Sequence, residues 1–274
     1  MHAIGTSTFP LSRYVEDVRT VAGGGGRTHR VDRLPDGRTA LVFRLVDGGR
    51  GDVTVVGPRT RALLKEATGF AYAVLLQFEP GWSTPLLGVS ARELTDAFVP
   101  LEDIWGRAGH ELLFDLLATT CSTDALGHIT SALARRVPRE PASASLARRA
   151  ARLIEAGEAR VERVADRLGV TARHLRRAFA ENIGIGPKEF ARSIRLQRAV
   201  RMAAASRDWS RIAADAGYYD QAHLITDFRN LVGLTPTAFL KRASERHSPP
   251  AGGHEEGPGA ARLGVSLTHR DALG

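Results

Sequence analysis

An internal repeat in the second half of the chain restricts its fold more than any other feature of the sequence. Ala165 and Gly169 recur 48 residues later as Ala213 and Gly217. Eight matches in the same order, several of them at glycine and proline, indicate two copies of one folding unit. After one inserted residue, the other six recur 49 residues later: His174, Leu175, Phe179, Gly184, Pro187 and Phe190 reappear as His223, Leu224, Phe228, Gly233, Pro236 and Phe239.

Each copy has the spacing of a helix-turn-helix. In the first copy, VERVADRLGV places its apolar residues on one face of a helix. Gly169 follows at the turn, where a left-handed backbone conformation costs glycine little. Thr171 is the expected cap of a second helix that begins with ARHLRRAF. The second copy keeps this arrangement, with Gly217 at the turn and Asp220 as the expected cap.

The outward face of the second helix carries the residues that differ between the copies. In the first copy, Arg173, Arg176 and Arg177 follow at i, i+3 and i+4 and share one face. A helix supported from behind and displaying arginines in front is suited to the major groove of DNA. The alternative is an ordinary amphipathic helix with a solvated face, which the duplication disfavours. We predict a DNA-binding face of nine residues: Arg173, His174, Arg176, Arg177, Gln221, Ala222, Ile225, Thr226 and Arg229.

The second copy offers different chemistry on this face. Gln221 can pair with adenine, and Ala222 or Ile225 can contact a thymine methyl group. Neither type of contact has the charge assistance that arginine supplies. We therefore expect the two copies to recognise different base sequences, and the first copy to contribute more to affinity.

A single helix is predicted between the copies, over PKEFARSIRLQRAVRMAAAS (187–206). About 19 helical residues span ~29 Å, which is close to the ~34 Å between successive major grooves on one face of DNA. One chain could therefore occupy two adjacent grooves. The arginines along this helix have two interpretations, phosphate contact or a solvated face: Arg192, Arg195, Arg198 and Arg201.

The positive charge of the chain is confined to the segment that holds the repeat. The whole chain carries a formal net charge of +8. Residues 1–140 are neutral, with 16 Lys/Arg and 16 Asp/Glu, whereas residues 141–246 carry 20 Lys/Arg and 11 Asp/Glu. Such an excess is the pattern expected of a surface that meets phosphates, although a solvated basic face would give the same composition.

The first half of the sequence alternates short apolar runs with turns. TALVFRLVDGG (39–49) and DVTVVGP (52–58) flank a Gly-Gly turn and predict a hairpin. FAYAVLLQFEPG (70–81) predicts another strand, ended by Pro-Gly. Closely spaced strands of this kind favour a small β-sandwich or barrel. From SARELTDAF (90–98) onward the pattern is helical, with helices predicted over 108–120 and 123–137.

These patterns predict an α+β chain in four parts. A β-rich sensor or dimerisation domain ending in helices takes residues 1–137, and a Pro- and Ser-rich linker takes 138–145. A helical domain of two helix-turn-helix modules joined by a long helix takes 146–246, and a disordered tail takes 247–274. GGGG (23–26) lacks the Gly-Lys-Ser/Thr of a phosphate-binding loop and is predicted to be a flexible loop.

Several other classes of protein fit the sequence poorly. It has neither an apolar run long enough to span a membrane nor the pattern of a secretory signal, which predicts a cytoplasmic protein. Cys121 is the only cysteine and is expected to be a buried or half-buried filler rather than a reactive thiol. The histidines of the first half lack ligand-like spacing, so neither a metal nor a cofactor is expected. Aromatic residues such as Trp82, Phe78 and Tyr72 fit a hydrophobic core better than a binding pocket.

At these residues the sequence resembles a known family. Residues 150–242 are similar to the DNA-binding domain of AraC-type (AraC/XylS) transcriptional regulators. The strongest match is IAADAGYYDQAHLITDFRNLVGLTPTAFLKR, including Gly-Leu-Thr-Pro-x-x-Phe. The resemblance implies a regulator that binds double-stranded promoter DNA and most often activates transcription through RNA polymerase. Members usually carry arginine two residues before the phenylalanine of the second recognition helix, whereas this chain has Thr226.

The first half resembles the sensor domain of one subgroup of these regulators. The residues that carry this resemblance lie in RLPDGRTALVFRL (33–45), FEPGWSTPLLGVSARELTD (78–96) and VPLEDIWG (99–106). It implies a cupin-like β-barrel followed by helices that serve effector binding or dimerisation. A small-molecule effector and a homodimer are thus compatible with the sequence.

Two other functions remain open at this point. A DNA-repair enzyme with an AraC-like module would need a cysteine nucleophile, but Cys121 has no basic neighbour in the sequence. No other catalytic arrangement stands out, so we expect that the protein is not an enzyme. An effector-independent DNA-binding protein would differ from a regulator only in lacking a ligand.

Overall fold

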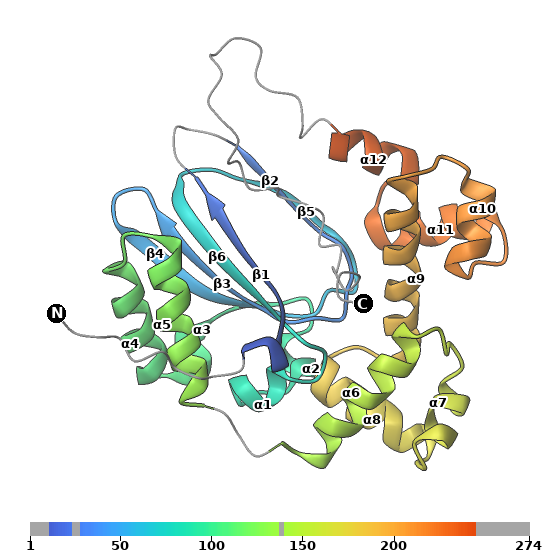
Figure 1. The fold of residues 1–274 in the computed structure, drawn as a ribbon, viewed down its shortest axis with the longest axis horizontal. Helices are drawn as coiled ribbons and strands as arrows, with labels where there is room; N and C mark the ends of the chain where they lie inside the picture. Colours follow the sequence, from blue (N-terminus) through green and yellow to red (C-terminus); the bar gives the residue numbers. More distant parts are fainter. Residues whose placement is uncertain (1–10, 24–27, 137–139, 245–274) are drawn as a thin grey trace, which may run out of the picture.

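A computed structural model describes residues 11–23, 28–136 and 140–244 of the protein (Figure 1). It consists of an N-terminal β-rich domain and a C-terminal helical domain, as predicted. The predicted glycine loop at 23–26, apart from Gly23, and the predicted tail at 247–274 lie outside the described residues.

The N-terminal domain is built on two antiparallel sheets. The larger sheet has the strand order β1-β6-β3-β4-β7. Its strands are β1 (Val15–Ala22), β3 (Ala40–Val46), β4 (Arg50–Val56), β6 (Phe70–Phe78) and β7 (Phe98–Pro100). A two-stranded sheet, here called the ribbon, pairs β2 (His29–Arg33) with β5 (Leu63–Ala67). Figure 1 shows the ribbon between the larger sheet and the helical domain.

The predicted hairpin is confirmed, because β3 and β4 pair antiparallel around Gly48 and Gly49. Both glycines have positive φ, which the turn requires. Residues 90–98 differ from the helical prediction. They form only a four-residue helix, α2 (Ala91–Leu94), before the edge strand β7 begins at Phe98. The pairing of β7 with β4 therefore overrides the local helical pattern.

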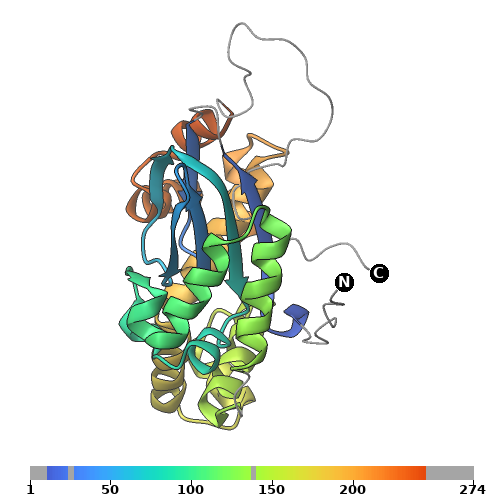
Figure 2. The same cartoon turned by 90° about the vertical axis from the view of Figure 1, so that its left-hand side faces the viewer.

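Successive side chains along the strands point to opposite faces of the larger sheet, so that one face packs in the core and the other lines a cavity. Alternate residues such as Phe43, Val74 and Leu76 are fully buried and face helices α4 and α5. Figure 2 shows these two helices in front of the larger sheet. Tyr72, Phe78 and Trp82 belong to the same core, which confirms their predicted role. The helices of this domain are α1 (Ser83–Leu87), α2, α3 (Leu101–Trp105), α4 (Arg107–Leu117) and α5 (Ser122–Ala134), with a short 3₁₀ turn, η1 (Leu11–Arg13), before β1.

The helical domain begins earlier than the predicted linker allows, because α6 starts at Ala142. The first module consists of α7 and α8, and the second module of α10 and α11. Helix α9 joins the two modules, and α12 follows the second (Figure 1). The bounds are α6 (Ala142–Glu155), α7 (Val161–Arg167), α8 (Ala172–Ile183), α9 (Pro187–Ala203), α10 (Trp209–Ala216), α11 (Gln221–Val232) and α12 (Pro236–Ser244).

The linker helix α9 has 17 residues and is therefore about 25 Å long. Its four arginines are all half-buried, and phosphate contact by them stays a prediction. Arg192 forms an ion pair with Asp227 of α11, and the Arg195 guanidinium lies 5.4 Å from the centre of the Tyr218 ring. Arg198 donates to the backbone oxygen of Glu155 at 3.1 Å. Arg192 and Arg195 thus hold the second module on α9, and Arg198 holds the end of α6 there.

Candidate nucleic-acid interface

The turn of each module is set by a glycine and by a capping side chain. Gly169 and Gly217 have φ values of 68° and 88°, in the left-handed region. Thr171 Oγ1 accepts a hydrogen bond at 3.1 Å from the backbone N–H three residues on, and Asp220 Oδ1 accepts the equivalent bond at 2.7 Å. Each cap stabilises the start of the following helix by about 1 kcal/mol. The predicted turns and caps are therefore confirmed.

Helix α8 of the first module has one buried and one exposed face. Leu175, Ala178 and Phe179 are buried against α6 and α9. Arg176 donates to Glu162 of α7 at 3.1 Å, and both side chains are at least half exposed. An exposed ion pair of this kind contributes about 1 kcal/mol or less, so that a phosphate could replace the carboxylate. Four predicted residues form the exposed face: Arg173, His174, Arg176 and Arg177.

Helix α11 of the second module presents a nearly neutral face. Gln221 Oε1 accepts a hydrogen bond from the Ser210 hydroxyl at 3.0 Å. Ile225 is half-buried against the cluster around Tyr218, so that only part of its side chain is accessible. The other predicted residues of this face are exposed: Gln221, Ala222, Thr226 and Arg229. That the nine residues touch DNA stays a prediction.

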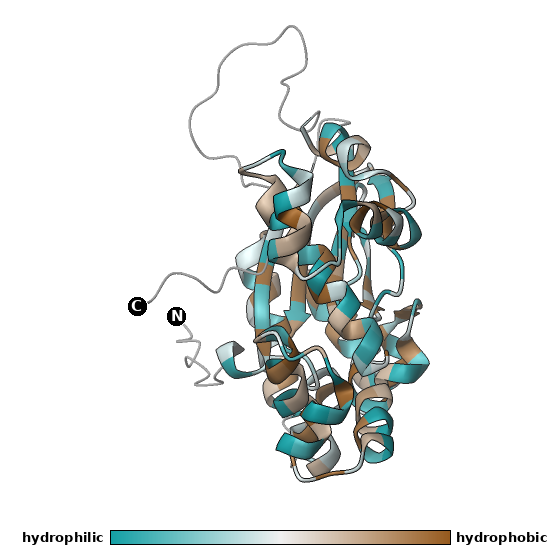
Figure 3. Ribbon diagram, turned by 90° about the vertical axis from the view of Figure 1, so that its right-hand side faces the viewer, coloured by the Kyte–Doolittle hydropathy of each residue, from teal (hydrophilic) through white to brown (hydrophobic). Residues whose placement is uncertain are grey.

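Helix α7 adds cations that the sequence analysis did not assign to the interface. Arg160 directly precedes the helix, Arg163 and Arg167 lie on it, and all three are exposed. The first helix of a helix-turn-helix crosses the DNA backbone, so these residues are candidates for phosphate contact. Their spacing at i, i+3 and i+7 in the sequence could have shown this, because such residues share one face of a helix. Figure 3 faces the helical domain and shows hydrophilic residues on the outward faces of its helices.

The first module is held against the N-terminal domain at the C-terminal end of α8. The hydroxyls of Thr84 and Ser90 both donate to the backbone oxygen of Glu181, each at 3.1 Å. The hydroxyl of Thr95 donates to the oxygen of Gly184 at 2.8 Å. These three hydroxyls satisfy carbonyl groups that a helix end leaves without partners.

The second module shares a hydrophobic cluster with the ribbon. Leu34, at the end of β2, is buried in the cluster with Phe228, Leu231 and Phe239. Leu64 of the ribbon packs against the same cluster. A backbone hydrogen bond of 2.7 Å joins the Ala62 N–H to the oxygen of Leu231. The core of the second module is therefore completed by the N-terminal domain.

A buried arginine links the two domains near the base of the ribbon. The Arg38 side chain is 4% exposed and donates to Glu16 of β1 at 2.9 Å and to Glu155 of α6 at 3.0 Å. Burial alone would lower the pKa of Arg38, but the carboxylates of Glu16, Glu155 and Asp36 outweigh it and raise that pKa. This charge is thus fully compensated across the domain boundary.

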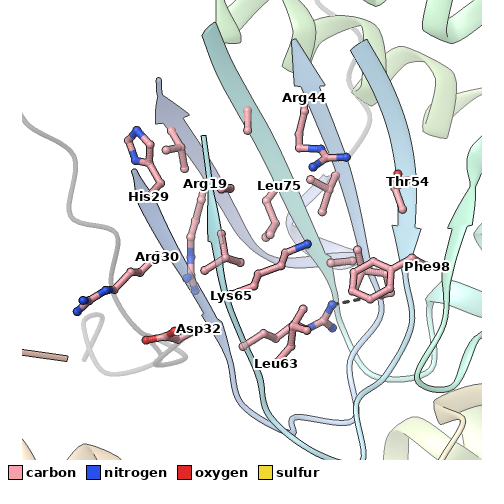
Figure 4. A pocket seen from close by; sticks show the side chains of 18 of the residues that line it. Arg19, His29, Arg30, Asp32, Arg44, Thr54, Leu63, Lys65, Leu75 and Phe98 are labelled. Atoms are coloured by element: carbon pink, nitrogen blue, oxygen red, sulfur yellow. Dashed lines mark hydrogen bonds between the residues drawn. The ribbon is translucent and has the colours of Figure 1, made fainter. Parts of the chain in front are cut away.

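A cavity of about 190 Å³ lies between the ribbon and the larger sheet (Figure 4). Its walls are mainly apolar, and they come from the strand faces opposite to the core, including Val42 and Leu75. Figure 4 shows Lys65 extending from the ribbon toward the larger sheet, with Phe98 beyond it. Desolvation lowers the pKa of Lys65, and the nearby Arg44 adds to this effect. The cavity therefore combines mainly apolar walls with a partly desolvated lysine.

The described ranges contain neither a cluster of residues that could hold a metal ion nor a helix long and apolar enough to cross a membrane. Cys121 is exposed rather than buried, in contrast to the prediction. It lies at the N-cap of α5.

Two family models match the chain. Residues 164–242 match a helix-turn-helix domain, and residues 7–100 match a domain of unknown function (DUF6597). No curated protein matches. The first match confirms the resemblance of the C-terminal domain to the AraC type, and the second is compatible with the resemblance of the N-terminal half.

Several solved structures are also similar. A probable AraC family transcriptional regulator from Rhodopseudomonas palustris is 28% identical over 36% of this chain and 97% of its own, with a TM-score of 0.32. A DNA-binding transcriptional dual regulator from Escherichia coli K-12 is 24% identical over 37% and 94%, with a TM-score of 0.33. Unsaturated fatty acid bound ToxT from Vibrio cholerae is 12% identical over 81% and 93%, with a TM-score of 0.41.

Proposed function

For this DNA-binding regulator, whose C-terminal domain is an AraC-type double helix-turn-helix, we propose that α8 and α11 enter successive major grooves on one face of promoter DNA. The observation that carries the proposal is the exposed arginine face of α8. The opposite face of this helix is buried in the core, so the arginine face is the one available to DNA. The two modules stand at opposite ends of α9 (Figure 1). Its length of about 25 Å, together with the width of the modules, suits the ~34 Å between grooves.

The two modules make unequal contributions to binding. Arg173 and Arg177 are exposed and supply cations to phosphates or guanine edges, whereas α11 offers only Arg229 as a charged group on its predicted face. Arginine contacts release counterions from DNA, so that affinity falls as salt rises. The first module therefore supplies most of the salt-dependent affinity, and the second supplies sequence preference.

Footprinting on genomic fragments selected by the purified protein tests this proposal. Protection of one DNA face over about two helical turns per chain is expected. Replacement of Arg173 by alanine should weaken binding and reduce the salt dependence. The matched control is Arg107→Ala, because Arg107 is an exposed arginine on α4 of the other domain. Equal losses from both variants, or the absence of a protected site, would refute the proposal.

The N-terminal domain is proposed to bind a small effector in the cavity between its sheets. The cavity favours a ligand-responsive regulator over an effector-independent DNA-binding protein, because mainly apolar walls there surround the Lys65 ammonium group. Such walls suit an organic anion. The ribbon forms one wall of this cavity and also packs on the second module. An effector that displaces the ribbon would therefore change the position of α11.

Other aspects of the function are also proposals. Activation through RNA polymerase and homodimerisation through the N-terminal domain follow from the AraC-type resemblance, and a cytoplasmic location follows from action on DNA. Transcription in vitro and sedimentation test the first two. A role as a DNA-repair enzyme is not favoured, because among the described residues no basic side chain pairs with the Cys121 thiol. We propose that the protein is not an enzyme.

A further inference from the structure

The turn of the second module contains one residue more than the turn of the first. Between Gly169 and the cap Thr171 there is one residue, whereas Gly217 and the cap Asp220 are separated by two. The extra residue is Tyr219, whose exposure of 92% is the highest of the large hydrophobic residues in the described ranges. The repeat thus adds an aromatic side chain at the turn and leaves it in solvent.

The neighbours of Tyr219 fix the direction in which it points. Tyr218 is 5% exposed and lies in the module core, with its ring edge-on to His223 at 5.3 Å. The backbone N–H of Tyr219 is 3.5 Å from Nδ1 of the same histidine, and Asp220 caps α11 directly after it. Because these contacts lie on the core side of the turn, the Tyr219 side chain points outward at the N-terminal end of α11.

This position is the one that approaches DNA in a helix-turn-helix, because the N-terminal residues of the recognition helix contact the groove. Tyrosine hydroxyls are among the groups that donate to phosphate oxygens there. An exposed ring contributes little to folding, since it buries almost no apolar surface. The adjacent face of α11 has few charges, so another phosphate contact would be needed to position the helix.

We propose that Tyr219 is a DNA-contact residue of the second module, with its phenolic O–H donating to a phosphate oxygen beside the groove entered by α11. This inference rests on the proposed function. The contact is neutral, so it adds affinity without releasing a counterion. The loss of the second copy's arginines is then partly offset by a hydrogen bond that salt does not weaken.

Binding of a selected DNA site by Tyr219→Phe and Tyr219→Ala variants tests the inference. Both variants should bind about tenfold more weakly than the original protein, with an unchanged slope of log affinity against log salt. Their thermal unfolding should be unchanged, because the side chain is exposed. Phe114→Ala is the matched control, since Phe114 is a 76% exposed aromatic residue on α4, and it should bind normally.

The possible results are distinguishable. Full binding by Tyr219→Phe would overturn the hydroxyl contact, whether or not Tyr219→Ala is weaker. A reduced salt slope in Tyr219→Phe would also overturn it, because the loss of a neutral donor leaves the number of counterions released on binding unchanged. Failure of the unaltered protein to select any DNA site would instead refute the proposed function itself.

Discussion

Asp32 of strand β2 and Arg242 of helix α12 form an ion pair across the domain boundary, with 3.3 Å between Oδ1 and Nη2. The Asp32 side chain is completely buried, whereas that of Arg242 is 26% exposed. Arg30, also on β2, donates to the backbone oxygen of Arg242 at 3.2 Å. Because β2 lines the cavity, this pair connects the wall of the proposed effector site to the second module.

Replacement of Arg242 by alanine is expected to lower the free energy of unfolding by about 1–3 kcal/mol, because it removes a charged donor from a buried carboxylate. Urea unfolding measures this change. A double-mutant cycle with Asp32→Asn isolates the coupling between the two side chains. If the double variant loses as much unfolding free energy as the two single variants together, the interaction between the two side chains contributes nothing to stability.

The Arg177→Ala variant is expected to weaken specific DNA binding by about 1–3 kcal/mol, because Arg177 lies on the exposed arginine face of α8. Thr226→Ala should change binding little, since the hydroxyl of Thr226 supplies no charge at the equivalent face of α11. Titration of both variants on one selected DNA site makes the comparison. If the two substitutions cost the same, the ranking of the modules is wrong.

Local patterns were sufficient for the two helix-turn-helix modules. The caps Thr171 and Asp220 and the turn glycines follow from spacing, because a helix-turn-helix is specified by short-range geometry. The β3–β4 hairpin was predictable for the same reason. Site residues on α8 were found exposed as expected, since helical periodicity separates the two faces.

Long-range contacts were not predictable in this way. The pairing of β2 with β5 joins residues 30 to 38 positions apart, and β7 forms only by pairing with β4. The contacts of the α9 arginines were missed because their partners, such as Asp227 of α11 and Tyr218 of the turn before it, lie outside α9. The cavity likewise exists only once the two sheets face each other, so its cations had no recognisable pattern in the sequence.

Lys65 is exposed overall, so its replacement by methionine is expected to stabilise the ligand-free protein only slightly at neutral pH. Desolvation in the cavity, with Arg44 and Arg59 nearby, lowers the pKa of Lys65 below its ordinary value of 10.5, while Asp52 opposes this effect. Between the folded and unfolded pKa values the unfolded chain holds more protons, so that the unfolding free energy rises with pH there.

The advantage of Lys65→Met should therefore shrink as the pH rises toward 10.5. Thermal unfolding of both proteins from pH 7 to pH 10 measures the difference. The control Lys188→Met replaces an exposed lysine on α9 and should show no such trend. A constant difference across this range would contradict a partly desolvated ammonium group at the cavity.

Gly184 and Gly233 occupy equivalent positions in the repeat, and comparing them measures how firmly the first module is docked. Both follow a recognition helix and have positive φ, 89° and 77°. A Cβ on Gly184 would lie 2.5 Å from Pro58 Cγ and 2.6 Å from the oxygen of Ala91, both in the N-terminal domain. A Cβ on Gly233 would have nothing within 4 Å.

Gly184→Ala should therefore destabilise the protein more than Gly233→Ala. Both variants carry the left-handed backbone cost of about 1–2 kcal/mol, but only Gly184→Ala adds overpacking, worth about 1–3 kcal/mol more. Urea unfolding of the two variants gives this difference directly. Because the backbone term is shared, equal destabilisation would mean that α8 does not rest on the N-terminal domain in solution, and that the three hydroxyl contacts at its end do not form there.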